Sequence, residues 1–164
     1  DEGVNLGPLT TAKRLEEIER LVDKTKKEGA EVLLGGKRPS GFNKGFFYEP
    51  TVFDHVKDDF TIMKEEPFGP LVPMLSFKSF DEVIERANDN DLGLCSYLYT
   101  NSMDKANRGS ELLETGCVAV NTGAVAIAEA PFGGIKQTGY GREGGSMAIK
   151  DYLNVKYTHM ALEI

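Results

Sequence analysis

The sequence predicts an α/β fold in which short strands form a parallel sheet. In the second half of the chain, apolar runs and amphipathic segments follow one another in the order strand, helix, strand, helix, strand. Because the connections between them are short, we expect right-handed crossovers and parallel pairing. The composition agrees, since 40% apolar and 27% charged residues, mixed along 164 positions, are typical of a globular domain with a core of its own.

The first half is expected to open with an amphipathic helix. Apolar residues recur every three to four positions from Ala12 onward, Thr10 or Thr11 is suited to cap the amino end, and Gly29 is suited to end the helix. The segment EVLLGG follows as a short strand. After a loop rich in Gly, Pro, Ser and Asn, FFYEPTVF contains a further strand, in which Pro50 marks an edge or a break.

The second half carries clear start and stop signals. Ser79 and Glu82 form an S-x-x-E capping box, and Ser102 caps another helix that Gly116 ends. In parallel sheets binding sites lie at the carboxyl ends of the strands, so the motifs that follow the last strand stand where function is expected. The expected elements are a strand over 71–77, a helix over 80–90, the strand SYLYT, a helix over 102–115 and the strand CVAVN.

Composition argues against several classes of partner and site. The net charge of −7 without a basic cluster disfavours nucleic acid, and the lack of a long apolar run or signal peptide disfavours the membrane, so we expect a cytoplasmic protein. His55 and His159 have no metal-ligand spacing, so no metal site is expected. Cys95 and Cys117 lack a C-x-x-C spacing and a neighbouring histidine, so both are expected to serve in packing rather than catalysis.

The glycine-rich segment APFGGIKQTGYGREGG, residues 130–145, contains a formal match to G-x-G-x-x-G. A dinucleotide fingerprint follows a strand directly and opens a helix, and here no predicted strand immediately precedes the match. The favoured alternative is structural: glycine lets the backbone adopt positive φ and pass close to its neighbours. Phe132, between Pro131 and Gly133, would then be projected away from a tightly turning backbone.

A second motif, KEEPFGP, occupies residues 64–70. Pro67 and Pro70 stiffen the backbone, so Glu66 and Phe68 are expected to be held in place. The residues alone leave two interpretations open. The motif is either a solvated acidic turn beside a core phenylalanine, or a pair of carboxylates suited to acid–base work.

Four segments in this order carry a resemblance to a known family. They are KEEPFGPLVPMLSF, ANDNDLGLCSYLYT, ETGCVAVNTG and APFGGIKQTGYGREGG, and together they resemble the C-terminal third of an NAD(P)-dependent aldehyde dehydrogenase. The tail and QTGYGREGG are most similar to the succinate-semialdehyde dehydrogenase branch. The resemblance implies a parallel-sheet distal part of the catalytic domain over 1–150 and an oligomerisation tail over 151–164. Apolar and polar residues alternate in that tail, which predicts an interaction strand over 152–161.

The resemblance also implies roles for individual residues. Glu66 matches the glutamate that holds the nicotinamide ribose hydroxyls, and Phe68 matches the phenylalanine beside the nicotinamide of NAD or NADP. Phe132 matches a residue of the tunnel for a small aldehyde, and the loop 122–130 is where family members differ in substrate. In this loop Thr122 carries the only hydroxyl and no residue is cationic, which departs from the serine of semialdehyde members. That departure puts succinate semialdehyde in doubt, because a buried carboxylate needs a partner.

No catalytic residue is assigned by the resemblance. The family's nucleophilic cysteine lies in G-Q-x-C and its general base in E-L-G-G, and neither motif occurs in this sequence. The resemblance therefore implies a fragment that is inactive alone, taken from an enzyme that forms homo-oligomers, dimers or tetramers. The alternative is a naturally truncated, non-catalytic module for oligomerisation or binding.

Overall fold

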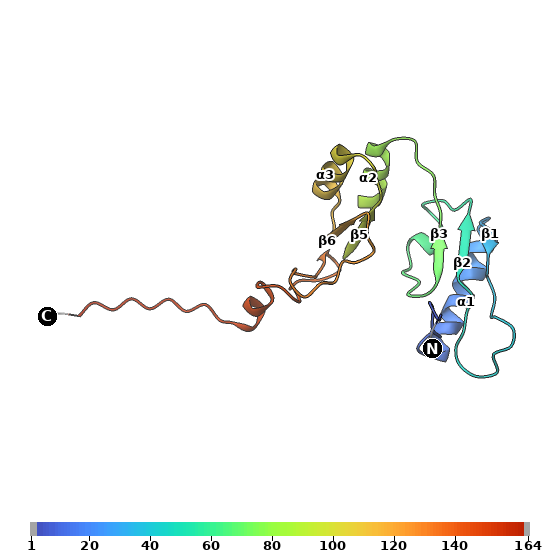
Figure 1. Cartoon of the computed structure of the whole chain (residues 1–164), viewed down its shortest axis with the longest axis horizontal. Helices are drawn as coiled ribbons and strands as arrows, with labels where there is room; N and C mark the ends of the chain where they lie inside the picture. Colours follow the sequence, from blue (N-terminus) through green and yellow to red (C-terminus); the bar gives the residue numbers. More distant parts are fainter. Residues whose placement is uncertain (1–2, 163–164) are drawn as a thin grey trace. The chain divides into compact units, whose positions relative to one another are not determined.

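The computed structural model describes residues 3–162 and divides the chain into two compact units, one up to Ser76 and one from Phe77 onward (Figure 1). The first unit combines helices with one three-stranded sheet, and the second combines helices with two two-stranded sheets, which confirms the α/β class. One sheet is mixed, one is antiparallel and one is parallel, so the expectation of parallel pairing alone is corrected. Within the described residues, no helix is both long and apolar enough to cross a bilayer.

The first unit is a three-stranded sheet with one long helix. The helix α1 (Ala12–Lys27) precedes β1 (Glu31–Leu34), β2 (Thr51–Asp54), the 3-10 helix η1 (Thr61–Met63) and β3 (Leu71–Pro73). The strand order is β1-β2-β3, with β1 antiparallel and β3 parallel to β2. The strand β2 starts directly after Pro50, as the sequence predicts.

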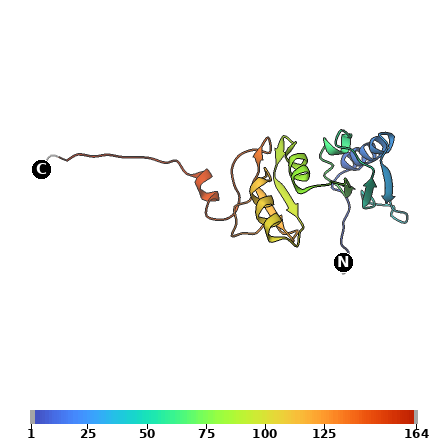
Figure 2. The same ribbon diagram turned by 90° about the horizontal axis from the view of Figure 1, so that it is seen from above.

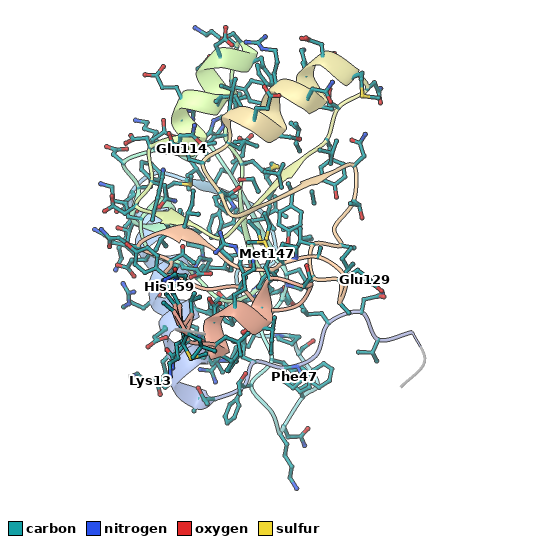
Figure 3. The ribbon with its side chains drawn as sticks, turned by 90° about the vertical axis from the view of Figure 1, so that its left-hand side faces the viewer. Lys13, Phe47, Glu114, Glu129, Met147 and His159 are labelled. Atoms are coloured by element: carbon teal, nitrogen blue, oxygen red, sulfur yellow. The ribbon has the colours of Figure 1, made fainter. Side chains whose placement is uncertain are left out.

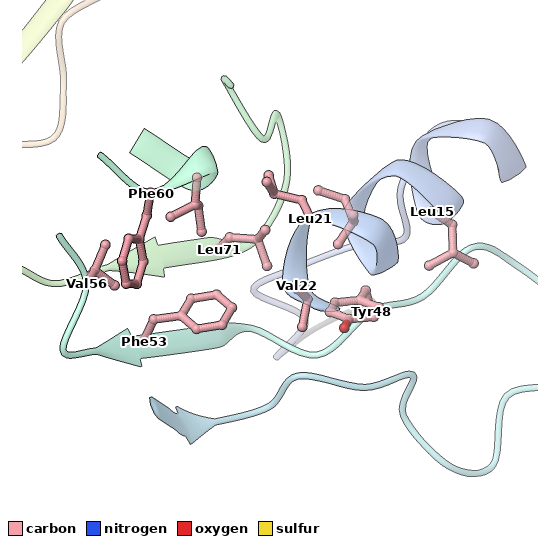
Figure 4. Close-up of a cluster of buried hydrophobic side chains, with 10 residues drawn as sticks. Leu15, Leu21, Val22, Tyr48, Phe53, Val56, Phe60 and Leu71 are labelled. Atoms are coloured by element: carbon pink, nitrogen blue, oxygen red, sulfur yellow. The ribbon is translucent and has the colours of Figure 1, made fainter. Parts of the chain in front are cut away.

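Helix α1 forms as its sequence dictates and supplies much of the core of this unit. The hydroxyl of Thr11 accepts a hydrogen bond from the Arg14 amide at 3.1 Å, so Thr11 is the cap. Gly29 follows the helix with a φ of 108°, which confirms it as the stop. The apolar stripe of α1 packs on β2, β3 and η1 (Figure 4). The buried cluster consists of Leu15, Ile18, Leu21, Val22, Tyr48, Phe53, Val56, Phe60, Ile62 and Leu71.

The second unit is built on a parallel strand pair. β5 (Cys95–Leu98) and β6 (Cys117–Val120) pair in register, and α2 (Phe80–Asn88) and α3 (Met103–Leu112) lie before and between them in the chain. Ser79 is confirmed as the cap of α2, since its hydroxyl accepts from the Glu82 amide at 3.1 Å. The Glu82 carboxylate reaches back past the cap and accepts from the Lys78 amide at 2.8 Å. Ser102 caps α3 in the same way, accepting from the Lys105 amide at 3.3 Å.

Several expected elements end earlier than predicted, and two of them differ by three residues or more. The strand expected over 71–77 ends at Pro73, and it pairs with β2 instead of joining the later strands. The helix expected over 102–115 ends at Leu112. The Asn88 side chain ends it, because its amide donates to the Leu112 carbonyl at 2.8 Å and its oxygen accepts from the Glu114 amide at 2.9 Å.

The remainder of the second unit is a glycine-rich excursion and a tail. β4 (Leu92–Gly93) and β7 (Ile135–Lys136) pair antiparallel, and the 3-10 helix η2 (Ala148–Tyr152) comes before the tail. Residues 153–162 run away from the rest of this unit as an extended, exposed segment without a paired strand among the described residues (Figure 2). The interaction strand expected over 152–161 therefore stays a prediction that requires a second chain.

Candidate functional site

The KEEPFGP loop, residues 64–70, is anchored to α1 at two points. The Glu65 carboxylate pairs with the guanidinium of Arg20. Gly69 lies so close to the helix that an added Cβ would be 2.5 Å from the Cδ1 atom of Ile18. Because the loop is fixed at both its acidic and its glycine positions, the residues between them are held in a defined conformation.

Glu66 and Phe68 are the two residues that this loop presents to solvent. Glu66 is exposed, and its carboxylate has no hydrogen-bond or ion-pair partner among residues 3–162. Phe68 is 73% exposed and has a φ of 41°, a strained value for an aromatic residue. Phe68 is therefore not part of the core formed by the described residues. The two carboxylates also differ, since Glu65 is neutralised by Arg20 and Glu66 is open, so they do not act as a pair.

The ring of Phe68 is supported from one side by α1. The guanidinium carbon of Arg14 lies 5.9 Å from the ring centroid, within cation–π range, and contributes roughly 0.5–1 kcal/mol at such an exposed site. Arg14 is itself oriented by an ion pair with Glu17 at 2.9 Å. The loop therefore offers an unpaired carboxylate beside an aromatic ring with an open face. A carboxylate of this kind can accept hydrogen bonds from two neighbouring hydroxyls.

In the second unit, the glycine-rich segment 130–145 folds back on itself. The Phe132 and Glu143 backbones exchange two hydrogen bonds of 2.7 Å. A Cβ added to Gly133 would lie 2.5 Å from the Gly141 carbonyl oxygen. Only glycine permits this approach, which confirms the structural interpretation of these glycines. Among the described residues, the helix that follows GYGREG is only the short 3-10 helix η2, so the geometry of a dinucleotide fingerprint is not formed.

The side chain of Lys136, in the same segment, is bound by other groups of the second unit. The Lys136 ammonium donates to the carbonyl oxygens of Asn88 and Asn90, each at 3.0 Å, and lies 2.6 Å from the Glu114 carboxylate (Figure 3 labels Glu114). It thus satisfies carbonyls at the carboxyl end of α2, where a positive charge also suits the helix dipole. Sequence reasoning missed this role. The available signal is that α2 runs into the acidic segment DND without a glycine or a basic residue directly after it.

The arginine of the segment is bound in a similar way. One Arg142 guanidinium nitrogen donates to the carbonyl oxygens of Gly134 at 2.9 Å and Gly141 at 2.7 Å. Its backbone amide donates to the Asp151 carboxylate at 2.9 Å, which ties η2 to the segment. The hydrogen-bond donors of Lys136 and Arg142 are therefore engaged by backbone carbonyls and by acidic groups of the second unit.

Phe132 is partly buried next to these contacts, and the loop 122–130 follows β6. The Thr122 hydroxyl accepts from the Ala124 amide at 3.1 Å, so it is used within the loop. An open cavity of about 640 Å³ in this unit is lined by residues of 88–91 and 136–140, and Phe132 is not among its lining residues. The structure thus places Phe132 beside the variable loop but outside this cavity.

Comparison with known proteins identifies the family. The sequence model of the aldehyde dehydrogenase family matches residues 1–158. This chain belongs to the aldehyde dehydrogenase family. It is similar to the mitochondrial succinate-semialdehyde dehydrogenase of Oryza sativa subsp. japonica, at 41% identity over 161 residues, covering 98% of this chain and 30% of the relative. It is also similar to the chloroplastic betaine aldehyde dehydrogenase of Beta vulgaris, at 40% identity over 156 residues, covering 95% and 31%.

Solved structures agree with the sequence relatives. The NAD+ complex of an aldehyde dehydrogenase from Bacillus cereus superposes with a TM-score of 0.90 at 44% identity, covering 95% of this chain and 31% of that one. This chain thus spans about a third of the length of its relatives. Family membership and the α/β fold are therefore shown.

Neither cysteine of this aldehyde dehydrogenase chain has the setting of a nucleophile. Burial raises the pKa of the Cys95 thiol above its ordinary value, and the neighbouring thiol of Cys117 raises this pKa further. An activated catalytic thiol needs the opposite shift, which a nearby cation or a helix amino terminus would provide. The surroundings of Cys95 are thus those of a packed thiol and not of an activated nucleophile.

Proposed function

We propose that this chain is the distal part of the catalytic domain of an NAD(P)-dependent aldehyde dehydrogenase, and that it holds the nicotinamide half of the cofactor. The observation that carries the proposal is the contrast within one loop: Glu65 is paired with Arg20, whereas the Glu66 carboxylate is open beside the exposed ring of Phe68. Positive φ at an exposed aromatic residue is typical of a functional position, and a bound ligand accounts for both Phe68 and the unpaired Glu66 carboxylate.

The residues present fit a nicotinamide riboside by their chemistry. The Glu66 carboxylate can accept both ribose hydroxyl hydrogens, and the open face of Phe68 limits where a flat heterocycle rests. The cofactor, NAD or NADP, accepts the hydride when it is bound. Orientation by Glu66 and Phe68 matters because hydride transfer requires the donor carbon close to the acceptor. The nucleophilic thiol and the general base come from sequence outside this chain.

The substrate we propose is a small aldehyde that contacts Phe132 and the loop 122–130. Succinate semialdehyde is one candidate, but the two relatives above carry names with substrates of opposite charge at nearly the same identity. Lys136 and Arg142 are held by backbone carbonyls, and Thr122 is bonded within its loop. If the substrate has a terminal carboxylate, a cation other than Lys136 and Arg142 therefore has to be supplied.

Oligomer formation is the second part of the proposal. We assign residues 151–164 to a tail that adds a strand to a partner subunit in a homo-oligomer, a dimer or a tetramer. Its support is the exposure of alternate apolar side chains, with Leu153 at 62%, Val155 at 101% and Tyr157 at 84%. An uncovered apolar edge of this kind is normally paired or covered. We assign residues 1–150 to the distal catalytic part and the protein to the cytoplasm, on its composition.

One assay separates the enzyme from a non-catalytic truncated module. The 164-residue chain alone is expected to show no turnover of short aldehydes with NAD or NADP, because it lacks the G-Q-x-C and E-L-G-G motifs. The gene is then sequenced upstream of Asp1, and the protein encoded by the longest in-frame open reading frame is assayed in the same way. An in-frame G-Q-x-C and turnover by that product support the dehydrogenase. An initiator codon at this boundary, with no such motif upstream, would establish the truncated module instead.

A further inference from the structure

The second unit holds a pair of thiols that the proposed function does not use. Cys95 opens β5, Cys117 opens β6, and the two residues are direct partners in the parallel register. They are the only two cysteines of the chain. Side chains of register partners leave the sheet on the same face. Neighbouring strands lie about 4.7–4.9 Å apart, and this spacing falls inside the Cα separation of about 4.4–6.8 Å found for disulfides.

The Cys117 thiol is held in place on the face of the sheet that it shares with Cys95. It donates a hydrogen bond to the Gly133 carbonyl oxygen at 3.7 Å. The strand starts are fixed by the backbone, since the Cys117 amide donates to the Leu94 carbonyl at 3.0 Å. Both side chains are half-buried, so a small oxidant can reach them while a bulky protein thiol has less access.

We propose that Cys95 and Cys117 are a redox-sensitive modification site that forms a reversible intramolecular disulfide with a peroxide oxidant. The minor ionised fraction of one thiol attacks hydrogen peroxide, which gives a sulfenic acid and releases one water after proton transfer. This step is slow because burial raises the pKa of the Cys95 thiol. The second thiol attacks the sulfenic sulfur, so that the S–S bond forms and a second water leaves. In sum, two thiols and one hydrogen peroxide give one disulfide and two waters. This inference goes beyond the proposed function and does not depend on it.

Bridging changes the local structure in a defined way. The Cβ atoms of the two residues have to draw together from the strand spacing to a separation of about 3.8 Å, a movement of about 1 Å. The thiol hydrogen that Cys117 donates to Gly133 is lost at the same time. Oxidation should therefore tighten the strand starts and release the backbone next to Phe132.

The test uses the 164-residue chain with hydrogen peroxide as the oxidant. Thiols are alkylated after quenching, and intact mass and peptide mapping are recorded. We expect monomeric protein that has lost two hydrogen atoms, a single cross-linked pair of peptides containing Cys95 and Cys117, and full recovery of both thiols with dithiothreitol. The variants Cys95→Ser and Cys117→Ser are matched controls that keep one thiol and should give no monomeric bridge.

A comparison of the folded and the unfolded chain tests whether the fold holds the two thiols next to each other. The same oxidation is run on the chain unfolded in urea, where the two thiols meet only by loop closure. The folded chain should bridge faster by about tenfold or more, because proximity replaces a search. The proposal is overturned by covalent dimers, by sulfinic or sulfonic acids as the main product, by absence of reaction, or by bridging no faster than in urea.

Discussion

Replacing Lys136 by methionine should destabilise the second unit, because its ammonium group binds two backbone carbonyls and a carboxylate of this unit. The substitution keeps the length of the apolar stem and removes the ammonium from the carbonyls of Asn88 and Asn90 and from Glu114. The bond to half-buried Asn88 is charge-assisted and accounts for about 1.5–3 kcal/mol. Asn90 is exposed and can bond to water, and the Glu114 pair is worth at most about 1 kcal/mol.

The expected loss is therefore about 2–3 kcal/mol in the free energy of unfolding of this unit. Native-state hydrogen exchange measures it locally. Amides of Cys117–Val120 report on the second unit, and amides of Thr51–Asp54 in the first unit give an internal reference. Lys105→Met, at an exposed position on α3, is the matched control. Equal protection of β6 in the two variants would refute the structural role and leave Lys136 free to bind a substrate.

Three further predictions follow from single contacts. Gly116→Ala should cost about 3 kcal/mol or prevent folding in thermal melts, since the new Cβ would lie 1.9 Å from a carbonyl oxygen, whereas Gly123→Ala meets nothing within 4 Å. The Glu28 carboxylate accepts hydrogen bonds from the Thr61 hydroxyl at 2.6 Å and amide at 3.0 Å, which lower its pKa below 4.5. The contribution of this carboxylate to the free energy of unfolding is complete above pH 4.5 and is lost as the pH falls through the lowered pKa. In Glu28→Gln, the free energy of unfolding measured by urea titration should therefore decrease less at acidic pH. An unchanged decrease would contradict this role of Glu28. Deleting 153–164 from the complete enzyme should give monomers or insoluble protein in sedimentation, and a soluble parent oligomer would show that the tail is dispensable.

Local signals in the sequence were sufficient for the starts of the helices. Thr11, Ser79 and Ser102 all act as caps, because a cap needs only a hydroxyl and amides two or three positions away. Contacts over long distances along the chain were not predictable in this way. The end of α3 is set by Asn88, which lies on another helix, and the local pattern of 102–115 contains no trace of it.

The candidate site shows the same difference between local signals, which the sequence reveals, and contacts between residues that are distant in sequence. The motif KEEPFGP marks both glutamates equally, and only the fold separates them, because Arg20 is 45 positions away in sequence from Glu65. The exposure of Phe68 could not be predicted either, since an aromatic residue between proline and glycine is ordinarily assigned to the core. The composition of the glycine-rich segment did predict its close backbone approaches, although the partner carbonyls became known only from the structure.

The most direct test of the proposed cofactor site compares Glu66→Gln with Glu65→Gln in the complete enzyme. Glutamine keeps the shape of either residue and removes its charge. At Glu66 it weakens charge-assisted hydrogen bonds of about 1.5–3 kcal/mol each, so NAD affinity or the rate of hydride transfer should fall about tenfold. Ester hydrolysis, which needs no hydride transfer, should change much less. Glu65→Gln should leave cofactor kinetics near the parent's, because this carboxylate is already engaged by Arg20. Unchanged NAD binding and hydride transfer in Glu66→Gln, or an equal loss in both variants, would contradict the account.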